Sequence, residues 1–257
     1  LRQYQNKDFG LGHGLEPDIR MPNSSIAATN HGVVVLEQVK DRMVKEKFLE
    51  ELVHYYEETY DETLERFVMV SKEVEDYPHA IWWSYKDVLE NFPFGNPDPE
   101  VIGFLYQNRK HLKKVNINRL INTVIDYVKT ETFKESGMHS ILSVARFYKR
   151  VDKDVQNLIK DRLIEVIDNE IEKNLDQWNG YALEPYKVYI VSPDLCVNQL
   201  VHLEENLGQL LEKISSLSVS IPWQWYRDED VFEEVKNDWL GFLYFTMIKA
   251  LRLHREL

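Results

Sequence analysis

The chain has 257 residues, of which 44% are apolar, so it can form a hydrophobic core and is too apolar for a disordered protein. Its 31 Lys and Arg against 43 Asp and Glu give a net charge of −12, which disfavours nucleic acid and anionic membrane surfaces as partners. Cys196 is the only cysteine, which excludes an intrachain disulfide and a cysteine-based metal cluster. No apolar run reaches the roughly 18 residues of a membrane span, and the first residues lack a signal-peptide pattern. We therefore expect a cytoplasmic protein.

The N-terminal third begins with two helices of different character. The chain starts without Met and within a helical pattern, so we expect its first helix to be incomplete. Residues 24–39 are apolar nearly all round, with Ser24 or Ser25 as the cap, which predicts a helix buried on several sides. Residues 43–65 carry an apolar stripe at intervals of three to four and a charged opposite face. This pattern predicts a helix with one face in water.

The same alternation continues along the chain. Apolar helices are predicted over residues 98–106, 138–150 and 239–253, and amphipathic helices over 116–134 and 153–175, with an intermediate helix over 197–214. Residues 188–191 are the one candidate strand, and it is short. The sequence therefore predicts an all-α protein.

Alternating apolar and amphipathic helices indicate an inner ring enclosed by an outer ring. This arrangement is an α/α toroid, and we predict one such domain over residues 1–257. A stacked array of helical hairpins is the alternative. An array would leave its last helix half exposed, whereas here the last helix, 239–253, is the most apolar. This favours the closed ring.

Long loops connect the amphipathic helices to the apolar ones. They cover residues 6–23, 66–97, 176–196 and 215–238. Parallel inner helices would place all four at one mouth of the ring, and long loops in a compact domain are usually functional. Five of the six tryptophans lie in these loops, and Trp239 follows directly.

Carboxylates in these loops are candidate catalytic groups. GHGLEPD, which contains Glu16 and Asp18, is echoed by GYALEPY, which contains Glu184. Carboxylates whose surroundings separate their pKa values can run acid and base chemistry, including glycoside cleavage. The alternative is structural, because a Glu before Pro can cap a helix or pair with a Lys. His79 is likewise either a general base or a hydrogen-bonded loop histidine.

Aromatic side chains and one further histidine are candidate binding groups. His13 lies between two glycines, where backbone freedom allows a ligand to approach closely. Aromatic rings can stack on a sugar or an isoprenoid, or they can simply plug the ring. The candidates are Trp82, Trp83, Tyr181, Trp223 and Trp225.

The motifs also resemble a known family. QNKDFG, GLEPD and SSIAATNHGVVVL resemble the prenyltransferase and squalene-oxidase repeat, although Phe9 directly follows Asp8, so a glycine pair is missing. PHAIWW, NPDPEVIGFL, GYALEPYKVYIVSPD, PWQW and NDWLGFLYFTMIKALRLH resemble a group of uncharacterised bacterial proteins with toroid-like repeats. The resemblance implies a terpenoid-cyclase-like α/α toroid with a central cavity, without implying a reaction.

The catalytic motifs of the enzymes with that fold are missing. Residues 228–231, Asp-Glu-Asp-Val, lack the last Asp of a protonating Asp-x-Asp-Asp cluster, and no Asp-Asp-x-x-Asp sequence for Mg²⁺ occurs. Zinc is bound by Asp, Cys and His side chains, and these types occur at Asp194, Cys196 and His202. Cys196 and His202 are six residues apart, however, which is more than one helical turn. We therefore predict no metal site and no cofactor.

Three functional hypotheses remain open. The first is a carbohydrate-active hydrolase or lyase that uses Glu16, Asp18 or Glu184. The second is an isoprenoid-binding or terpenoid-processing protein without the standard metal motifs. The third is a non-enzymatic binding or scaffold protein. In the first two, the partner is a small molecule in a central cavity. The sequence leaves the oligomeric state open.

Overall fold

The computed structural model describes residues 1–91, 94–178, 181–226 and 228–256, so Gly180 of the GYALEPY motif lies outside the described residues. Helix accounts for 66% of the structure and strand for 3%. The prediction of an all-α protein is therefore confirmed.

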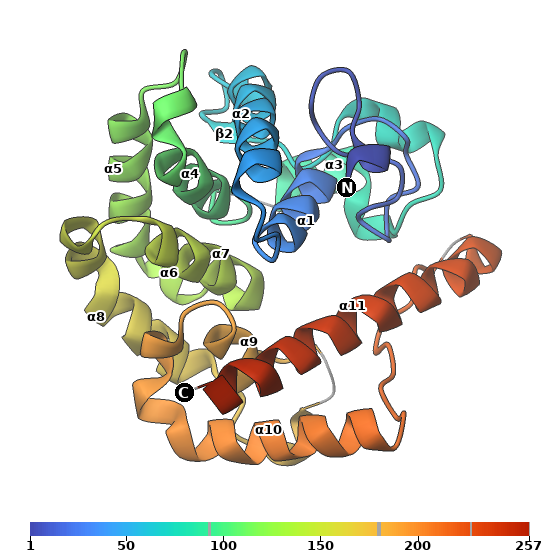
Figure 1. Cartoon of the computed structure of the whole chain (residues 1–257), viewed down its shortest axis with the longest axis vertical. Helices are drawn as coiled ribbons and strands as arrows, with labels where there is room; N and C mark the ends of the chain where they lie inside the picture. The colour runs from blue at the N-terminus through green and yellow to red at the C-terminus, as the bar shows by residue number, and fades with distance from the viewer. Residues whose placement is uncertain (92–93, 179–180, 227, 257) are drawn as a thin grey trace.

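Helices follow one another along most of the chain (Figure 1). They are α1 (Ile26–Leu36), α2 (Arg42–Thr59), α3 (Tyr85–Asn91), α4 (Asp98–Gln107), α5 (Ile117–Val128), α6 (Glu131–Lys134), α7 (Gly137–Arg150), α8 (Lys153–Glu170), α9 (Pro185–Tyr189), α10 (Leu200–Ser215) and α11 (Glu229–Glu256). Short 3-10 helices are η1 (Arg2–Tyr4), η2 (Lys72–Asp76), η3 (Ile81–Trp83), η4 (Arg109–His111), η5 (Leu175–Gln177) and η6 (Pro193–Gln199). The antiparallel strands β1 (Tyr60–Asp61) and β2 (Arg66–Phe67) form the sheet.

Several sequence-based elements differ from the structure. The helix predicted over 43–65 ends at Thr59, where β1 begins, and the helix predicted over 153–175 ends at Glu170. The helix predicted over 116–134 is two helices, because the Thr130 side chain accepts a hydrogen bond from Phe133 N and caps α6. The last helix begins at Glu229, ten positions before the predicted start at 239. The strand predicted over 188–191 is wrong: α9 covers its first two residues, with Pro185 in the first turn where a missing N–H costs nothing.

The apolar and amphipathic helices form two layers in the middle of the chain. Helix α4 packs closely on α7, because a Cβ atom added to Gly103 would lie only 2.8 Å from the Cα atom of Phe147. Helices α5 and α8 pack outside this pair. Helix α5 buries its apolar face and exposes its polar face. The five residues on that buried face are Leu120, Ile121, Val124, Ile125 and Val128.

The C-terminal helix returns to the N-terminal part of the molecule. Figure 1 shows α11 running across the fold from its C-terminal end beside α9 and α10 toward the N-terminal segment. The ring of Phe242 stacks on the ring of His31 in α1, with centroids 4.9 Å apart. The first and last long helices are therefore in contact, while the closed double ring itself stays a prediction. No helix within the described ranges is long and apolar enough to cross a bilayer.

Candidate functional site

The first two predicted loops lie side by side. Ile19 and His79 form an antiparallel bridge. Arg20 N donates to Pro78 O at 3.0 Å, and Ala80 N donates to Asp18 O at 3.0 Å. Glu16, Asp18 and His79, which belong to segments about 60 residues apart, are thus held in one substructure by backbone hydrogen bonds.

Asp18 joins the first loop to the last one. Its Oδ1 accepts hydrogen bonds from the indole of Trp225 at 2.6 Å and from the indole of Trp239 at 2.7 Å. The side chain is buried, and burial together with the nearby Glu16 raises its pKa to about 7. Both indole donors would lose a partner without this carboxylate, so its geometry fits a structural junction.

Glu16 contacts a histidine that the sequence analysis did not select. Its Oε2 lies 3.1 Å from Nε2 of His31 in α1. Burial raises the pKa of Glu16 to about 8 and lowers the pKa of His31 to about 4. Both shifts favour the uncharged forms, a protonated carboxyl group beside a neutral imidazole. The sequence signal for His31 is a polar ring within a helix that is otherwise apolar nearly all round.

A continuous series of ring contacts begins at His31, and we call it the aromatic belt. Its members are His31, Phe242, Trp239, Trp223, Tyr181 and His139. Trp223 and Trp239 meet edge to face at 5.1 Å, and Tyr181 lies 6.3 Å from Trp223. Two predicted binding residues, Tyr181 and Trp223, thus come together from different loops.

His139, at the end of the belt, is reached by solvent, yet burial lowers its pKa to about 4. The belt therefore reaches the surface of the protein at His139.

Glu184, in the second copy of the motif, is also buried. It occupies the N-cap position of α9, and its Oε2 accepts a hydrogen bond from Asn206 Nδ2 at 3.0 Å. Asn206 Oδ1 in turn accepts from Tyr186 N at 3.0 Å. Lys187 Nζ lies 3.8 Å from the same carboxylate. Glu184 therefore connects α9 to α10, and its predicted catalytic role stays a prediction.

The other predicted site residues have different surroundings. His79 is buried, with Nδ1 2.7 Å from the carbonyl oxygen of Tyr77. His13 is exposed in the left-handed region, at φ 56°, and its Nε2 lies 3.0 Å from Asn6 Oδ1. Trp83 is buried, while Trp82 is half-buried and packs against the core. None of these residues belongs to the aromatic belt.

A cavity of about 880 Å³ lies among the C-terminal parts of the apolar helices. We call it the basic cavity. Its lining consists of Val33, Leu36, Glu37, Gln38, Lys40, Lys45, Leu49, Phe104, Gln107, Asn108, Lys149, Arg150, Ile190, Val191, Pro193, Phe245, Ile248, Lys249, Arg252 and Leu253. These residues come from α1, α2, α4, α7 and α11 and from the segment after α9. The predicted site residues are outside this lining.

Positive charge dominates the basic cavity, although the whole chain is acidic. Six of its lining residues are Lys or Arg, and one, Glu37, is acidic. Burial opposes the ionisation of Glu37, but Arg150 at 3.0 Å and Lys149 at 3.6 Å hold its pKa below its usual range. The single carboxylate is therefore already shared between two cations.

Each cation of the basic cavity has an ordinary position in the sequence. Lys149 and Arg150 end α7, and Lys249 and Arg252 lie near the end of α11. Basic residues in the last turns of a helix are ordinary, since they complement the helix dipole. Only the fold shows that these particular turns converge on one cavity.

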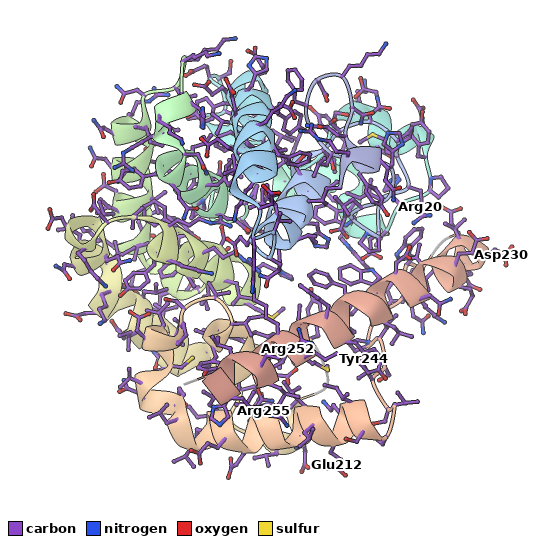
Figure 2. The ribbon with its side chains drawn as sticks, in the orientation of Figure 1. Arg20, Glu212, Asp230, Tyr244, Arg252 and Arg255 are labelled. Carbon is purple, nitrogen blue, oxygen red and sulfur yellow. The ribbon has the colours of Figure 1, made fainter. Side chains whose placement is uncertain are left out.

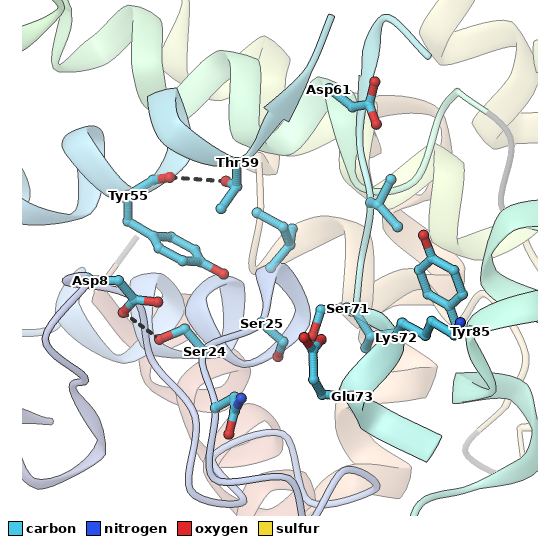
Figure 3. A pocket seen from close by; sticks show the side chains of 14 residues that line it. Asp8, Ser24, Ser25, Tyr55, Thr59, Asp61, Ser71, Lys72, Glu73 and Tyr85 are labelled. Atoms are coloured by element: carbon cyan, nitrogen blue, oxygen red, sulfur yellow. Dashed lines mark hydrogen bonds between the residues drawn. The ribbon is translucent and has the colours of Figure 1, made fainter. Parts of the chain in front are cut away.

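A second pocket, of about 420 Å³, lies between the N-terminal segment and α2 (Figure 3). Asp8, Asp61 and Glu73 line it together with Tyr55 and several hydroxyl side chains. Asp8 Oδ1 accepts a hydrogen bond from Ser24 Oγ at 2.7 Å. Within the part of the chain that the structure describes, no group of three or more His, Cys, Asp or Glu side chains is arranged to hold a metal ion.

Comparisons with known proteins add no relative. No protein-family model, no curated protein and no solved structure matches the chain. The resemblance to toroid-like bacterial proteins therefore stays a prediction, and the functional argument depends on the geometry described above.

Proposed function

We propose that this chain binds a small organic anion with an apolar segment in a central cavity of an α/α toroid. The observation that carries the proposal is the basic cavity, with its six cations, one carboxylate and large apolar surface. Its volume of about 880 Å³ is within the range of known small-molecule sites, about 300–1,000 Å³.

The arrangement of charges favours an anion over a neutral ligand. Lys249 and Arg252 form no ion pair with any carboxylate in the described ranges, and Glu37 is occupied by Lys149 and Arg150. Cations inside a cavity are screened less by salt than cations on an open surface. A carboxylate, phosphate or sulfate would neutralise them, while Phe245 and Ile248 would contact an apolar chain.

The same lining supports the toroid. Four of the helices predicted as apolar or inner, α1, α4, α7 and α11, each contribute residues of their C-terminal halves to the basic cavity. Parallel inner helices around a shared centre would produce this pattern. We propose that the fold is a toroid on this basis.

Binding can be tested directly on the whole chain. We expect decanoate and decyl phosphate to bind, measured by calorimetry, and decanol to bind at least about tenfold more weakly. Comparing the two anions identifies the head group. Arg252→Ala should weaken binding by about tenfold or more, because it removes an unneutralised cation from the lining.

Arg255→Ala is the matched control. Arg255 lies about one turn further along α11 and outside the cavity lining (Figure 2). It should leave binding unchanged. Equal affinity for decanol and decanoate, or equal effects of the two arginine substitutions, would contradict the proposal.

A second candidate function has a specific observation in its favour. Burial raises the pKa of Glu16 to about 8 beside the aromatic belt, where Trp223 Nε1 is buried without a hydrogen-bond partner among the described residues. A proton donor next to stacked rings would suit a carbohydrate-active hydrolase or lyase. Activity on a glycan that is lost in Glu16→Gln, while the fold is retained, would support this function over the first.

A further inference from the structure

Lys249 is placed differently from the other lysines of the basic cavity. It lies on the face of α11 formed by Phe245, Ile248, Lys249 and Arg252, which share one side of the helix because Phe245 and Lys249, and Ile248 and Arg252, are four positions apart. Lys249 therefore lines the same part of the cavity as the two apolar side chains that would contact the body of a ligand.

The amine of Lys249 lacks an acidic partner. No carboxylate within the described residues lies within ion-pair distance of it, and Glu37 is engaged by Lys149 and Arg150. Glu37 therefore attracts Lys249 only from beyond ion-pair distance. A lysine in a cavity without a partner is available to a ligand.

The surroundings also disfavour the charged form of this amine. Burial lowers the pKa of Lys249, and the positive charges of Lys149, Arg146 and Arg150 lower it further, against the attraction of Glu37. Desolvation and neighbouring cations are the two conditions that activate a lysine as a nucleophile, because only the neutral amine has a free electron pair.

We infer that Lys249 is a nucleophilic amine that forms an imine with an aldehyde or ketone group of the organic anion held in the basic cavity. The inference rests on the proposed function, because it needs the anion to be bound beside the amine. Arg252, which lines the same cavity and forms no ion pair with a carboxylate among the described residues, neutralises the anionic group, which leaves the carbonyl carbon to Lys249. The ligand class is therefore an oxo acid or a similar carbonyl-bearing anion with an apolar chain.

The reaction balances without a redox partner. The electron pair of the amine forms a bond to the carbonyl carbon, and the carbonyl oxygen gains a proton that nitrogen loses. The resulting carbinolamine then loses its hydroxyl group and the remaining nitrogen proton as water, leaving a C=N bond. Lys249 thus becomes covalently attached to the ligand, and hydrolysis releases it again.

Reductive trapping tests this inference. The whole chain is incubated with 2-oxooctanoate and sodium cyanoborohydride, and the product is examined by intact mass and peptide mapping. We expect one reduced adduct, located on Lys249, and a trapping rate that rises at lower pH than for an exposed lysine. Lys249→Arg has no amine that can form an imine, so it should yield no adduct at this position, while the slow background trapping on exposed lysines stays unchanged.

Two further ligands separate this inference from the proposed function. Octanoate has no carbonyl group that reacts with amines, so its affinity tests anion binding alone, and 2-octanone lacks the charge and should be trapped about tenfold more slowly. If octanoate binds but the adduct is absent or spread evenly over exposed lysines, the role of Lys249 is overturned and the proposed function stands. If octanoate does not bind, the proposed function fails, and an adduct confined to Lys249 would then show a reactive lysine without an anion site.

Discussion

Buried carboxylates are the main feature at the scale of single residues. Asp18 accepts from two indoles, Glu184 accepts from Asn206, and Glu16 pairs with His31. A buried polar group that has all its partners contributes to a specific structure, and removing one partner is costly. These three side chains of the GHGLEPD and GYALEPY motifs therefore have structural partners, and their catalytic role stays a prediction.

The pH dependence of stability tests the state of Glu16. Its pKa is about 8 in the folded protein, against an ordinary value of 4.5, so between these values the folded state holds a proton that the unfolded chain has lost. The free energy of unfolding therefore decreases as pH rises through this window. Glu16→Gln mimics the protonated acid and removes this contribution. Relative to Glu16→Gln, the wild type should lose up to about 1 kcal/mol of stability between pH 7 and 8.

Urea unfolding of both proteins at several pH values measures this difference, in which titrating groups that do not interact with Glu16 cancel. Parallel stability curves would show that Glu16 is ionised in the folded protein.

At the scale of elements, a glycine allows two helices to pack closely where its missing side chain leaves room. Gly103 lets α4 approach α7 closely enough for the Phe147 backbone to contact it. Gly208 in α10 lies in a helix too, but an added Cβ there would meet nothing within 4 Å. The two glycines therefore have opposite predicted responses to the same substitution.

Gly103→Ala should destabilise the protein by about 1–3 kcal/mol, since the two backbones would have to separate. Gly208→Ala should stabilise it by about 0.5–1 kcal/mol, because alanine loses less backbone entropy in a helix. Thermal and urea unfolding of both variants measure the effects. A stabilising Gly103→Ala would mean that α4 and α7 are not in close backbone contact.

At the scale of the whole molecule, the N-terminal loops and α1 contact the last loop and α11. Asp18 is 207 positions from Trp225 and 221 from Trp239 in the sequence, yet its carboxylate binds both indoles. His31 stacks on Phe242 in the same region. The N-terminal loops and α11 should therefore open together and not independently.

Hydrogen exchange of Asp18→Ala tests this coupling. Loss of the carboxylate leaves two indole donors without a partner, so protection should fall both around residues 16–21 and around 225–243. Asp18→Asn keeps an acceptor oxygen and should retain more protection in both segments. Faster exchange in the N-terminal loop alone would show that the two ends are not coupled.

The sequence by itself determined the helical class and most helix positions. Apolar side chains recurring at three to four along residues 116–128 or 153–167 can be buried together only on a helix, so the spacing alone specifies the element. It also indicated that Tyr181 and Trp223 come together, because loops at one end of parallel helices must be neighbours. The start of α11 was missed because six of the ten residues 229–238 are charged, although Phe232, Val235 and Trp239 recur at intervals of three and four.

Tertiary structure alone decided which of these residues share a site. His31 was not selected because a histidine in an apolar helix shows no partner until the fold brings Glu16 to it. The basic cavity is built from single turns of helices far apart in the chain, each with an ordinary charge for its position. Electrostatic interaction depends on distance in the fold and not on separation in the sequence. Only the packing of the helices therefore places those cations around one cavity.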